Sequence, residues 1–187
     1  MNSSFPLHLT SFLTEEELKK VTIPKTGWHR GVVIKNGVPR YSRMRTSRQR
    51  QLTARHMLMK IIMRHIQLLG ISGTLPNNLQ FSDDASLVKY ELGGRYEMHG
   101  DVSGMTHGRE YTVLVCLQPA EEGGETNFPN IAKKFMLKAG DALVWSNYHN
   151  GVENLNMDHE AMPVLKGVKI VVNSWFNEPD EPEGISR

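Results

Sequence analysis

Residues 90–101 read Tyr-Glu-Leu-Gly-Gly-Arg-Tyr-Glu-Met-His-Gly-Asp and end in a histidine and a carboxylate that are separated by one residue. On a β-strand, residues i and i+2 point to the same face, so His99 and Asp101 could converge on one metal ion. One imidazole and one carboxylate supply two of the three ligands of the 2-His-1-carboxylate site that holds non-heme Fe(II). By themselves these residues have a simpler explanation, as polar residues at the end of a strand. The hypothesis of a metal site therefore needs a second histidine.

Several further motifs follow this stretch at fixed spacings. They are Arg109 at the start of an apolar run, Gly-Gly-Glu-Thr at 123–126 ahead of Phe128-Pro129, Ala-Gly-Asp-Ala at 139–142, and a stretch at 159–175 that combines His-x3-Pro-Val, Gly-x-Lys and a late Trp. Together with residues 90–101, these motifs resemble those of the prolyl 4-hydroxylase family of Fe(II)/2-oxoglutarate dioxygenases. The resemblance extends from near Leu7 to about Phe176, and it is specific because several spacings must hold at once.

The resemblance implies a mainly β (α+β) fold, a double-stranded β-helix or jelly-roll, cupin-like barrel, with N-terminal helices packed on one sheet. The residues agree, because short strand-forming runs alternate with Gly, Asn and Pro turn signals. We expect strands at 87–92, 111–117, 134–137, 142–146 and 168–176. We expect a single domain over residues 1–187, with N-terminal support at about 5–75, a barrel core at about 80–177 and a flexible tail at 178–187.

Two helices are expected in the N-terminal support. Thr14 and Glu17 form a capping-box pattern, which predicts a helix that runs to about Val21. Ser47 is a candidate N-cap for a second helix that continues to Leu69. Apolar residues recur at helical spacing in the second half of that segment, so we expect this helix to pack on a sheet.

Three further histidines could supply the second imidazole of the metal site. His107 and His149 lie in segments with turn-forming neighbours, and a loop explains both. His159 stands ten residues before Lys169, which opens an apolar, β-branched run. We therefore expect the metal ligands to be His99, Asp101 and His159.

The resemblance also implies 2-oxoglutarate as a co-substrate. One carboxylate of that molecule chelates iron together with the keto oxygen, and the distal carboxylate must be neutralised in a poorly hydrated barrel. Lys169 is the candidate, because its neighbours in the sequence are apolar; a surface strand residue is the alternative. By resemblance, Tyr90 would donate a hydrogen bond to the co-substrate. The implied reaction consumes O₂, hydroxylates an unactivated C–H bond and releases succinate and CO₂.

Four residues are expected on the substrate side by resemblance. Tyr96 and Arg109 occupy positions at which relatives contact or line the substrate, although Tyr96 could be a structural strand aromatic and Arg109 the partner of a nearby acid. Arg45-Thr46-Ser47 resembles an element that helps to form the peptide-binding side, which adds Arg45 and Ser47. Many relatives have an aromatic residue shortly after this element, whereas residues 48–52 here read Arg-Gln-Arg-Gln-Leu. The identity of the substrate is therefore open.

Arginines cluster in the same region, at Arg40, Arg43, Arg45, Arg48, Arg50 and Arg55, with Tyr41 among them. A solvated loop would explain the cluster, and a substrate groove or a contact with nucleic acid are the functional alternatives. We favour the groove over nucleic acid. Nucleic-acid dealkylases of related fold anchor the co-substrate through an R-x-N-x-T-x-R string, which this sequence lacks.

Composition sets broad limits on the class of protein. The 187 residues are enough for one sizeable core, and the net charge of +2 does not argue for a polyanionic partner. The lone Cys116 cannot form an intramolecular disulfide. The sequence has no signal-peptide pattern and no apolar run of about 18 residues that could span a bilayer. We therefore expect a soluble, cytoplasmic protein without a membrane partner.

Three functions remain open at this level. The resemblance favours hydroxylation of a peptidyl proline in a peptide or protein substrate. The alternatives are hydroxylation of another residue or a small molecule by the same fold, and a non-catalytic binding module. His99, Asp101, His159 and Lys169 are all present, which argues against the binding module. Neither the oligomeric state nor a requirement for ascorbate follows from the sequence.

Overall fold

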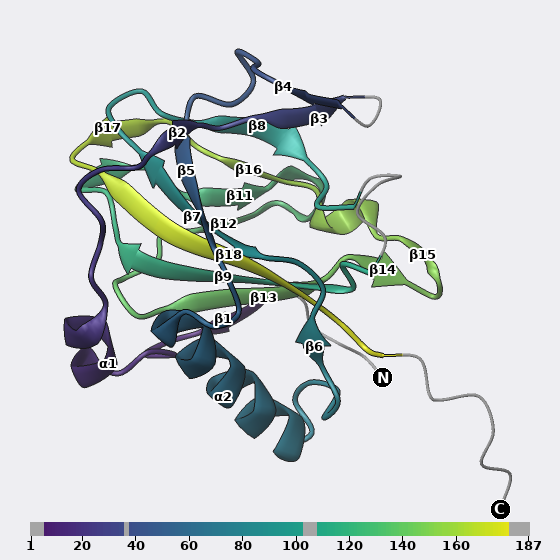
Figure 1. Cartoon of the computed structure of the whole chain (residues 1–187). Coiled ribbons are helices and arrows are strands. Elements are labelled where there is room, and N and C mark those ends of the chain that lie inside the picture. Colours follow the sequence, from purple (N-terminus) through teal and green to yellow (C-terminus); the bar gives the residue numbers. More distant parts are fainter. Residues whose placement is uncertain (1–5, 36–37, 103–107, 180–187) are drawn as a thin grey trace, which may run out of the picture.

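The computed structural model of the protein describes residues 6–35, 38–102 and 108–179. In these residues strands predominate, and two α-helices lie on one side of the largest sheet (Figure 1). The helices are α1 (Glu15–Lys20) and α2 (Met57–Ile71), with short 3-10 turns at η1 (Pro129–Ile131) and η2 (Leu155–Met157).

The major sheet has eight strands among the described residues, and the pairs within it are antiparallel. Its order is β1-β13-β9-β18-β7-β5-β2, and β6 pairs with β18 beside this path. The strands are β1 (Leu7–Leu9), β2 (His29–Arg30), β5 (Arg48–Leu52), β6 (Gln80–Phe81), β7 (Ala85–Tyr90), β9 (Tyr111–Gln118), β13 (Ala142–Ser146) and β18 (Lys169–Asn177).

A second, smaller sheet has the order β12-β11-β16-β8. Its strands are β8 (Tyr96–His99), β11 (Thr126–Phe128), β12 (Lys133–Phe135) and β16 (His159–Ala161). The described residues also form three separate two-stranded sheets: β3 (Val33–Lys35) with β4 (Val38–Arg40), β10 (Glu122–Gly123) with β17 (Val164–Lys166), and β14 (Tyr148–His149) with β15 (Val152–Glu153).

The side chains of the major sheet pack into two separate cores, one on each face of the sheet. Because successive residues of a strand point to opposite faces, Val113 and Val115 of β9 pack with the helices, whereas Leu114 and Cys116 pack with the smaller sheet. In β18, Val172 likewise belongs to the helix-side core. The expected double-stranded β-helix with helices on one sheet is confirmed, and the space between the two sheets is the barrel interior.

One of the two expected helices is confirmed, and the other begins later than expected. Thr14 and Glu17 form the predicted capping box, with both reciprocal hydrogen bonds present, and α1 ends within a residue of the expected end. Ser47, by contrast, does not cap a helix, and that prediction is wrong. Residues 48–52 form β5, which pairs with β7, and α2 starts only at Met57 with His56 as its N-cap. Pairing with the sheet edge overrides the local helix propensity of the Arg-Gln-Arg-Gln segment.

Some expectations are not tested. The division of the chain into support, core and tail stays a prediction, and residues 180–187 of the expected tail lie outside the described residues, as does His107. Within the described part of the chain, neither helix is long and apolar enough to cross a membrane.

Candidate active site

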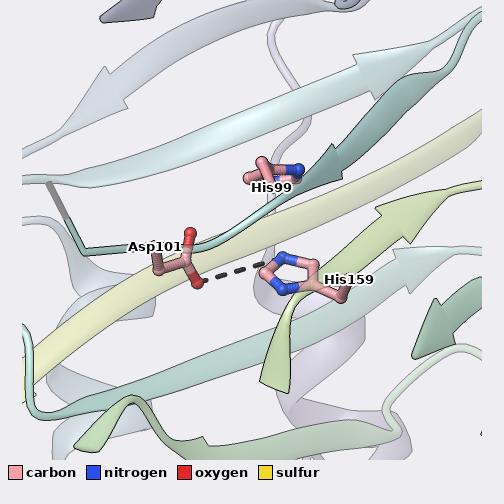
Figure 2. Close-up of side chains that lie close together, drawn as sticks. All are labelled: His99, Asp101 and His159. Atoms are coloured by element: carbon pink, nitrogen blue, oxygen red, sulfur yellow. Dashed lines mark ion pairs between the residues drawn. The ribbon is translucent and has the colours of Figure 1, made fainter. Parts of the chain in front are cut away.

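The three residues expected to bind a metal lie together at one end of the barrel. His99 ends β8 and His159 begins β16, and the two residues pair directly across these antiparallel strands. Their ring centroids are 4.4 Å apart, and His159 Nε2 lies 3.9 Å from Asp101 Oδ2. The candidate ligand atoms of all three residues lie within 4.8 Å of one another. Figure 2 shows the two imidazoles and the carboxylate converging on one small region.

The backbone fixes the tautomer of both imidazoles. His99 Nδ1 lies 2.8 Å from the carbonyl oxygen of Glu97, and His159 Nδ1 lies 3.0 Å from that of Met157. A carbonyl oxygen only accepts, so each Nδ1 carries the proton and donates it. In the neutral form of each ring, Nε2 is therefore the nitrogen that keeps its lone pair, as a metal ligand requires. Burial, followed by the neighbouring His159, lowers the pKa of His99 to about 3, so this imidazole is neutral at pH 7.

Asp101 supplies the carboxylate of the candidate site. Burial alone would raise the pKa of Asp101, but the two imidazoles and a hydrogen bond from Thr112 outweigh burial and hold the pKa below its ordinary value. Thr112 Oγ1 donates to Asp101 Oδ2 at 2.7 Å. One carboxylate beside two imidazoles is the donor set of a 2-His-1-carboxylate centre, so the residues fit Fe(II).

Lys169 lies in the barrel, and its side chain is a buried cation. The residue is 4% exposed, and its Nζ donates to the carbonyl oxygen of Gly124 at 2.6 Å and to Thr126 Oγ1 at 3.2 Å. No carboxylate of the described residues lies within 4.0 Å of this ammonium. Burial lowers the pKa of Lys169 to about 8. A buried ammonium held only by neutral acceptors is suited to bind an anionic ligand.

Tyr90 is the cross-strand neighbour of this lysine. The two residues pair between β7 and β18, and Lys169 Nζ lies 5.7 Å from the centre of the Tyr90 ring. Burial raises the pKa of Tyr90 to about 12, so its hydroxyl is protonated and can donate a hydrogen bond. The expected co-substrate residues therefore lie side by side on the barrel face of the major sheet.

On the other side of His99, aromatic and guanidinium groups form a stack. The Tyr96 ring is stacked on that of His99 with centroids 3.5 Å apart, and the Arg45 guanidinium lies 4.7 Å from the centre of the Tyr96 ring. Arg45 Nε donates to Ser47 Oγ at 2.9 Å, and Ser47 is only 1% exposed. Gly31 permits this packing, because a Cβ there would lie 2.7 Å from Ser47 Oγ. Arg45 and Tyr96 are placed to meet a substrate, whereas Ser47 is placed to support Arg45.

Arg109 also lies beside Asp101, but its guanidinium is engaged within the protein. Its Nε donates to Asp83 Oδ2 at 2.5 Å and its Nη1 to the carbonyl oxygen of Asp101 at 3.3 Å. The guanidinium carbon lies 3.8 Å from the centre of the Trp175 ring. The structure thus shows the acid partner that was the alternative explanation for this arginine.

The sequence analysis missed Thr112 and Asn147, and it gave no role to Thr126 of the 123–126 motif. Thr112 contacts Asp101, Thr126 contacts Lys169, and Asn147 contacts Thr112. The alternation of β9 places Thr112 on the same face as Leu114, which could have identified it as a barrel residue. The thiol of Cys116 is also on this face. Burial raises its pKa to about 11, so it is protonated and poorly reactive.

The fold and this cluster define a class: a double-stranded β-helix that carries two imidazoles, a carboxylate and a buried cation. A sequence profile of the 2OG-Fe(II) oxygenase superfamily matches residues 85–177, which include the three clustered residues and Lys169. The chain belongs to the 2OG-Fe(II) oxygenase superfamily, and within it the chain is similar to prolyl 4-hydroxylases.

Named relatives make that similarity specific. Prolyl 4-hydroxylase subunit alpha-2 of Gallus gallus is 29% identical over 180 residues, which are 89% of this chain and 33% of that protein. The subunit alpha-2 of Caenorhabditis elegans is 34% identical over 112 residues, 54% of this chain and 21% of that protein. The chain thus spans a third or less of the length of these two relatives.

A solved structure shares the fold over almost the whole chain. The viral collagen prolyl hydroxylase from Paramecium Bursaria Chlorella virus-1, determined as a 2OG complex, superposes with a TM-score of 0.68. The alignment covers 92% of this chain and 96% of that chain at 22% sequence identity. This similarity supports the fold assignment.

Proposed function

We propose that the protein is an Fe(II)- and 2-oxoglutarate-dependent dioxygenase that hydroxylates an unactivated C–H bond, and that its substrate is a peptidyl proline. One observation carries the proposal. The ligand atoms of His99, Asp101 and His159 lie within 4.8 Å of one another, in the same barrel as the buried cation of Lys169. A structural ion pair would not need two imidazoles whose Nε2 atoms are both left as acceptors.

The roles of the residues follow from their contacts. His99, Asp101 and His159 would hold Fe(II), and the Lys169 ammonium would neutralise the distal carboxylate of 2-oxoglutarate with a hydrogen bond from Tyr90. When bound, the metal and 2-oxoglutarate supply the oxidising chemistry, in which one atom of O₂ enters the substrate and the other enters succinate, with release of CO₂. The protein positions the reactants and excludes water from the barrel.

Support for a peptide substrate comes from the relatives and from the surface beside His99. The relatives carry the name prolyl 4-hydroxylase, and a similar structure from Trichoplax adhaerens, at a TM-score of 0.60 and 20% identity, contains a bound peptide fragment. In this chain, Arg45 and Tyr96 form a guanidinium–aromatic stack next to His99. Such a stack can pack against an extended peptide. Because fold and metal site do not by themselves select a substrate, the choice of proline needs a direct test.

That test is turnover with a panel of proline-containing peptides in the presence of Fe(II), 2-oxoglutarate, O₂ and ascorbate. We expect succinate formation that rises with peptide and a peptide mass that increases by one oxygen atom, assigned to proline by fragmentation. Succinate that rises with a free amino acid instead would favour the small-molecule alternative. No succinate under any condition would favour a non-catalytic binding module. Omitting ascorbate shows whether turnover depends on it.

A further inference from the structure

Asp101 is held by a chain of two buried polar residues, one on β9 and one in the bend that follows β13. We propose that Thr112 and Asn147 are positioning residues, which hold the Asp101 carboxylate in the orientation needed to bind the metal. This inference rests on the proposed function, because it assumes that Asp101 is a metal ligand.

The contacts in this chain are short and shielded from solvent. Thr112, on β9, is 0% exposed and donates from Oγ1 to Asp101 Oδ2 at 2.7 Å. Asn147, just after β13, is 4% exposed, and its Nδ2 donates to Thr112 Oγ1 at 2.8 Å and to the carbonyl oxygen of Arg109 at 3.0 Å. The Asp101 carboxylate is therefore linked through Thr112 to the segment that follows β13.

The chemistry of the partners fixes the direction of every hydrogen bond. The carbonyl oxygen of Arg109 can only accept, so the amide nitrogen of Asn147, rather than its oxygen, must face it. The same nitrogen supplies its second proton to Thr112 Oγ1. Thr112 has a single hydroxyl proton, and with its oxygen already accepting, that proton is directed to Asp101.

The position of the accepting oxygen links this chain to the metal site. Asp101 Oδ2, which accepts from Thr112, is also the oxygen that faces His159 Nε2 at 3.9 Å. A carboxylate oxygen has two lone pairs, so it can accept this hydrogen bond and still coordinate. The bond restrains rotation of the carboxylate and stabilises its ionised form.

The backbone around the chain is restrained as well. Asn147 N donates to the carbonyl oxygen of Glu110 at 2.8 Å, and Asn154 N donates to the carbonyl oxygen of Asn147 at 2.8 Å. Arg109 in turn donates to the carbonyl oxygen of Asp101 at 3.3 Å. The backbone of Asn147 is thus held by hydrogen bonds on both its N–H and its carbonyl oxygen, which supports a positioning role for its side chain.

The test compares Mn(II) affinity in Thr112→Val, Thr112→Ser and Asn147→Ala, measured from the free Mn(II) signal in electron paramagnetic resonance. Valine keeps the shape of threonine and removes the hydroxyl. We expect Thr112→Val to weaken Mn(II) binding about 10- to 100-fold, the usual effect of losing a partner of a metal ligand. Thr112→Ser should restore most of the affinity. Asn147→Ala should lose less than Thr112→Val, because the threonine hydroxyl can still reach Asp101.

A matched control is Ser174→Ala, which removes another fully buried hydroxyl from the same sheet. Ser174 Oγ donates to the carbonyl oxygen of Val113 at 3.1 Å, on the helix side. We expect this variant to bind Mn(II) as wild type does, even if its thermal stability falls. Thr112→Val with unchanged affinity would overturn the inference and leave a structural role only. If Thr112→Val does not fold, wild-type Mn(II) affinity in Asn147→Ala would also overturn the inference. Wild-type protein that binds no Mn(II) would instead contradict the proposed function.

Discussion

The two faces of the major sheet differ in what they bury. On the helix side, strands β9 and β18 present Val113, Val115, Ile170 and Val172, which are all apolar and at most 4% exposed. On the barrel side, the same two strands present Thr112 and Lys169 among apolar neighbours. The helix face supplies stability through apolar burial, whereas the barrel face carries the polar residues of the candidate site.

The barrel face also leaves polar atoms unsatisfied. Trp145 Nε1, Asn173 Oδ1 and Trp175 Nε1 are buried and have no hydrogen-bond partner among the described residues. Strand alternation places all three on the barrel side, since Trp145 packs in the barrel core and residues 173 and 175 share a face with Val171. Such atoms cost free energy, and they concentrate here at a candidate site.

The largest expected effect separates function from stability on the barrel face. His99→Ala removes one proposed ligand, so we expect turnover to fall by about a thousandfold or more, the scale on which loss of a catalytic group acts. The fold should persist, because His99 lies at the end of β8, outside both apolar cores. Succinate formation and circular dichroism measure the two quantities. Turnover near the wild-type level would remove His99 from the ligand set.

The converse change is made on the helix side. Ile62 of α2 is 0% exposed, so Ile62→Ala should lower the free energy of unfolding by about 2–5 kcal/mol. The affinity of the folded variant for 2-oxoglutarate should match that of wild type, because the residue packs across the sheet from the barrel. Urea denaturation and calorimetric titration provide the comparison. A large change in affinity without loss of stability would show that the two faces are coupled.

A smaller effect is expected from pH. Below pH 8, Lys169 is charged and can neutralise a carboxylate; above pH 8, it loses its proton because burial lowers its pKa to about 8. The affinity of the Mn(II)-loaded protein for 2-oxoglutarate should therefore be flat up to about pH 7.5 and then fall by up to tenfold per pH unit. Lys169→Arg, whose guanidinium stays charged, should show no such fall. The same decline in both proteins would assign the titration to another group.

The same pKa shift makes the stability of the fold rise with pH, whereas the affinity for 2-oxoglutarate falls. The folded pKa of Lys169 lies below its ordinary value of 10.5, so the unfolded chain binds more protons between about pH 8 and that value. The contribution of this residue to the free energy of unfolding should therefore rise with pH across that window. Burying the charged lysine costs stability at neutral pH, as expected for a group kept for binding.

How much the sequence could predict depends on whether the interaction is local. The His-x-Asp spacing, the capping box at Thr14 and the apolar run of β18 are local patterns, and the structure contains all three. The helix predicted from Ser47 failed because residues 48–52 pair instead with β7, whose partner residues lie 33 or more positions further along the chain. The chain from Asn147 through Thr112 joins residues 35 apart, so no spacing in the sequence indicates it.

Arg109 was only partly predictable from the sequence. Its position near the site follows from the resemblance, but its contacts with Asp83 and Trp175 depend on how three segments pack. A role for Arg109 in substrate binding stays a proposal. The structure favours a role in holding the backbone of Asp101.

The most direct measurement of the proposed function is an anaerobic titration of the protein with Fe(II) and 2-oxoglutarate, followed by the visible charge-transfer band of the complex. Wild type should show the band, His159→Ala should abolish it, and Lys169→Ala should need far more 2-oxoglutarate. Lys166→Ala is the control, because Lys166 is an exposed lysine paired with Glu121 at 2.8 Å. It should behave as wild type. If wild type shows no band, or if His159→Ala leaves it unchanged, the proposed metal centre is contradicted.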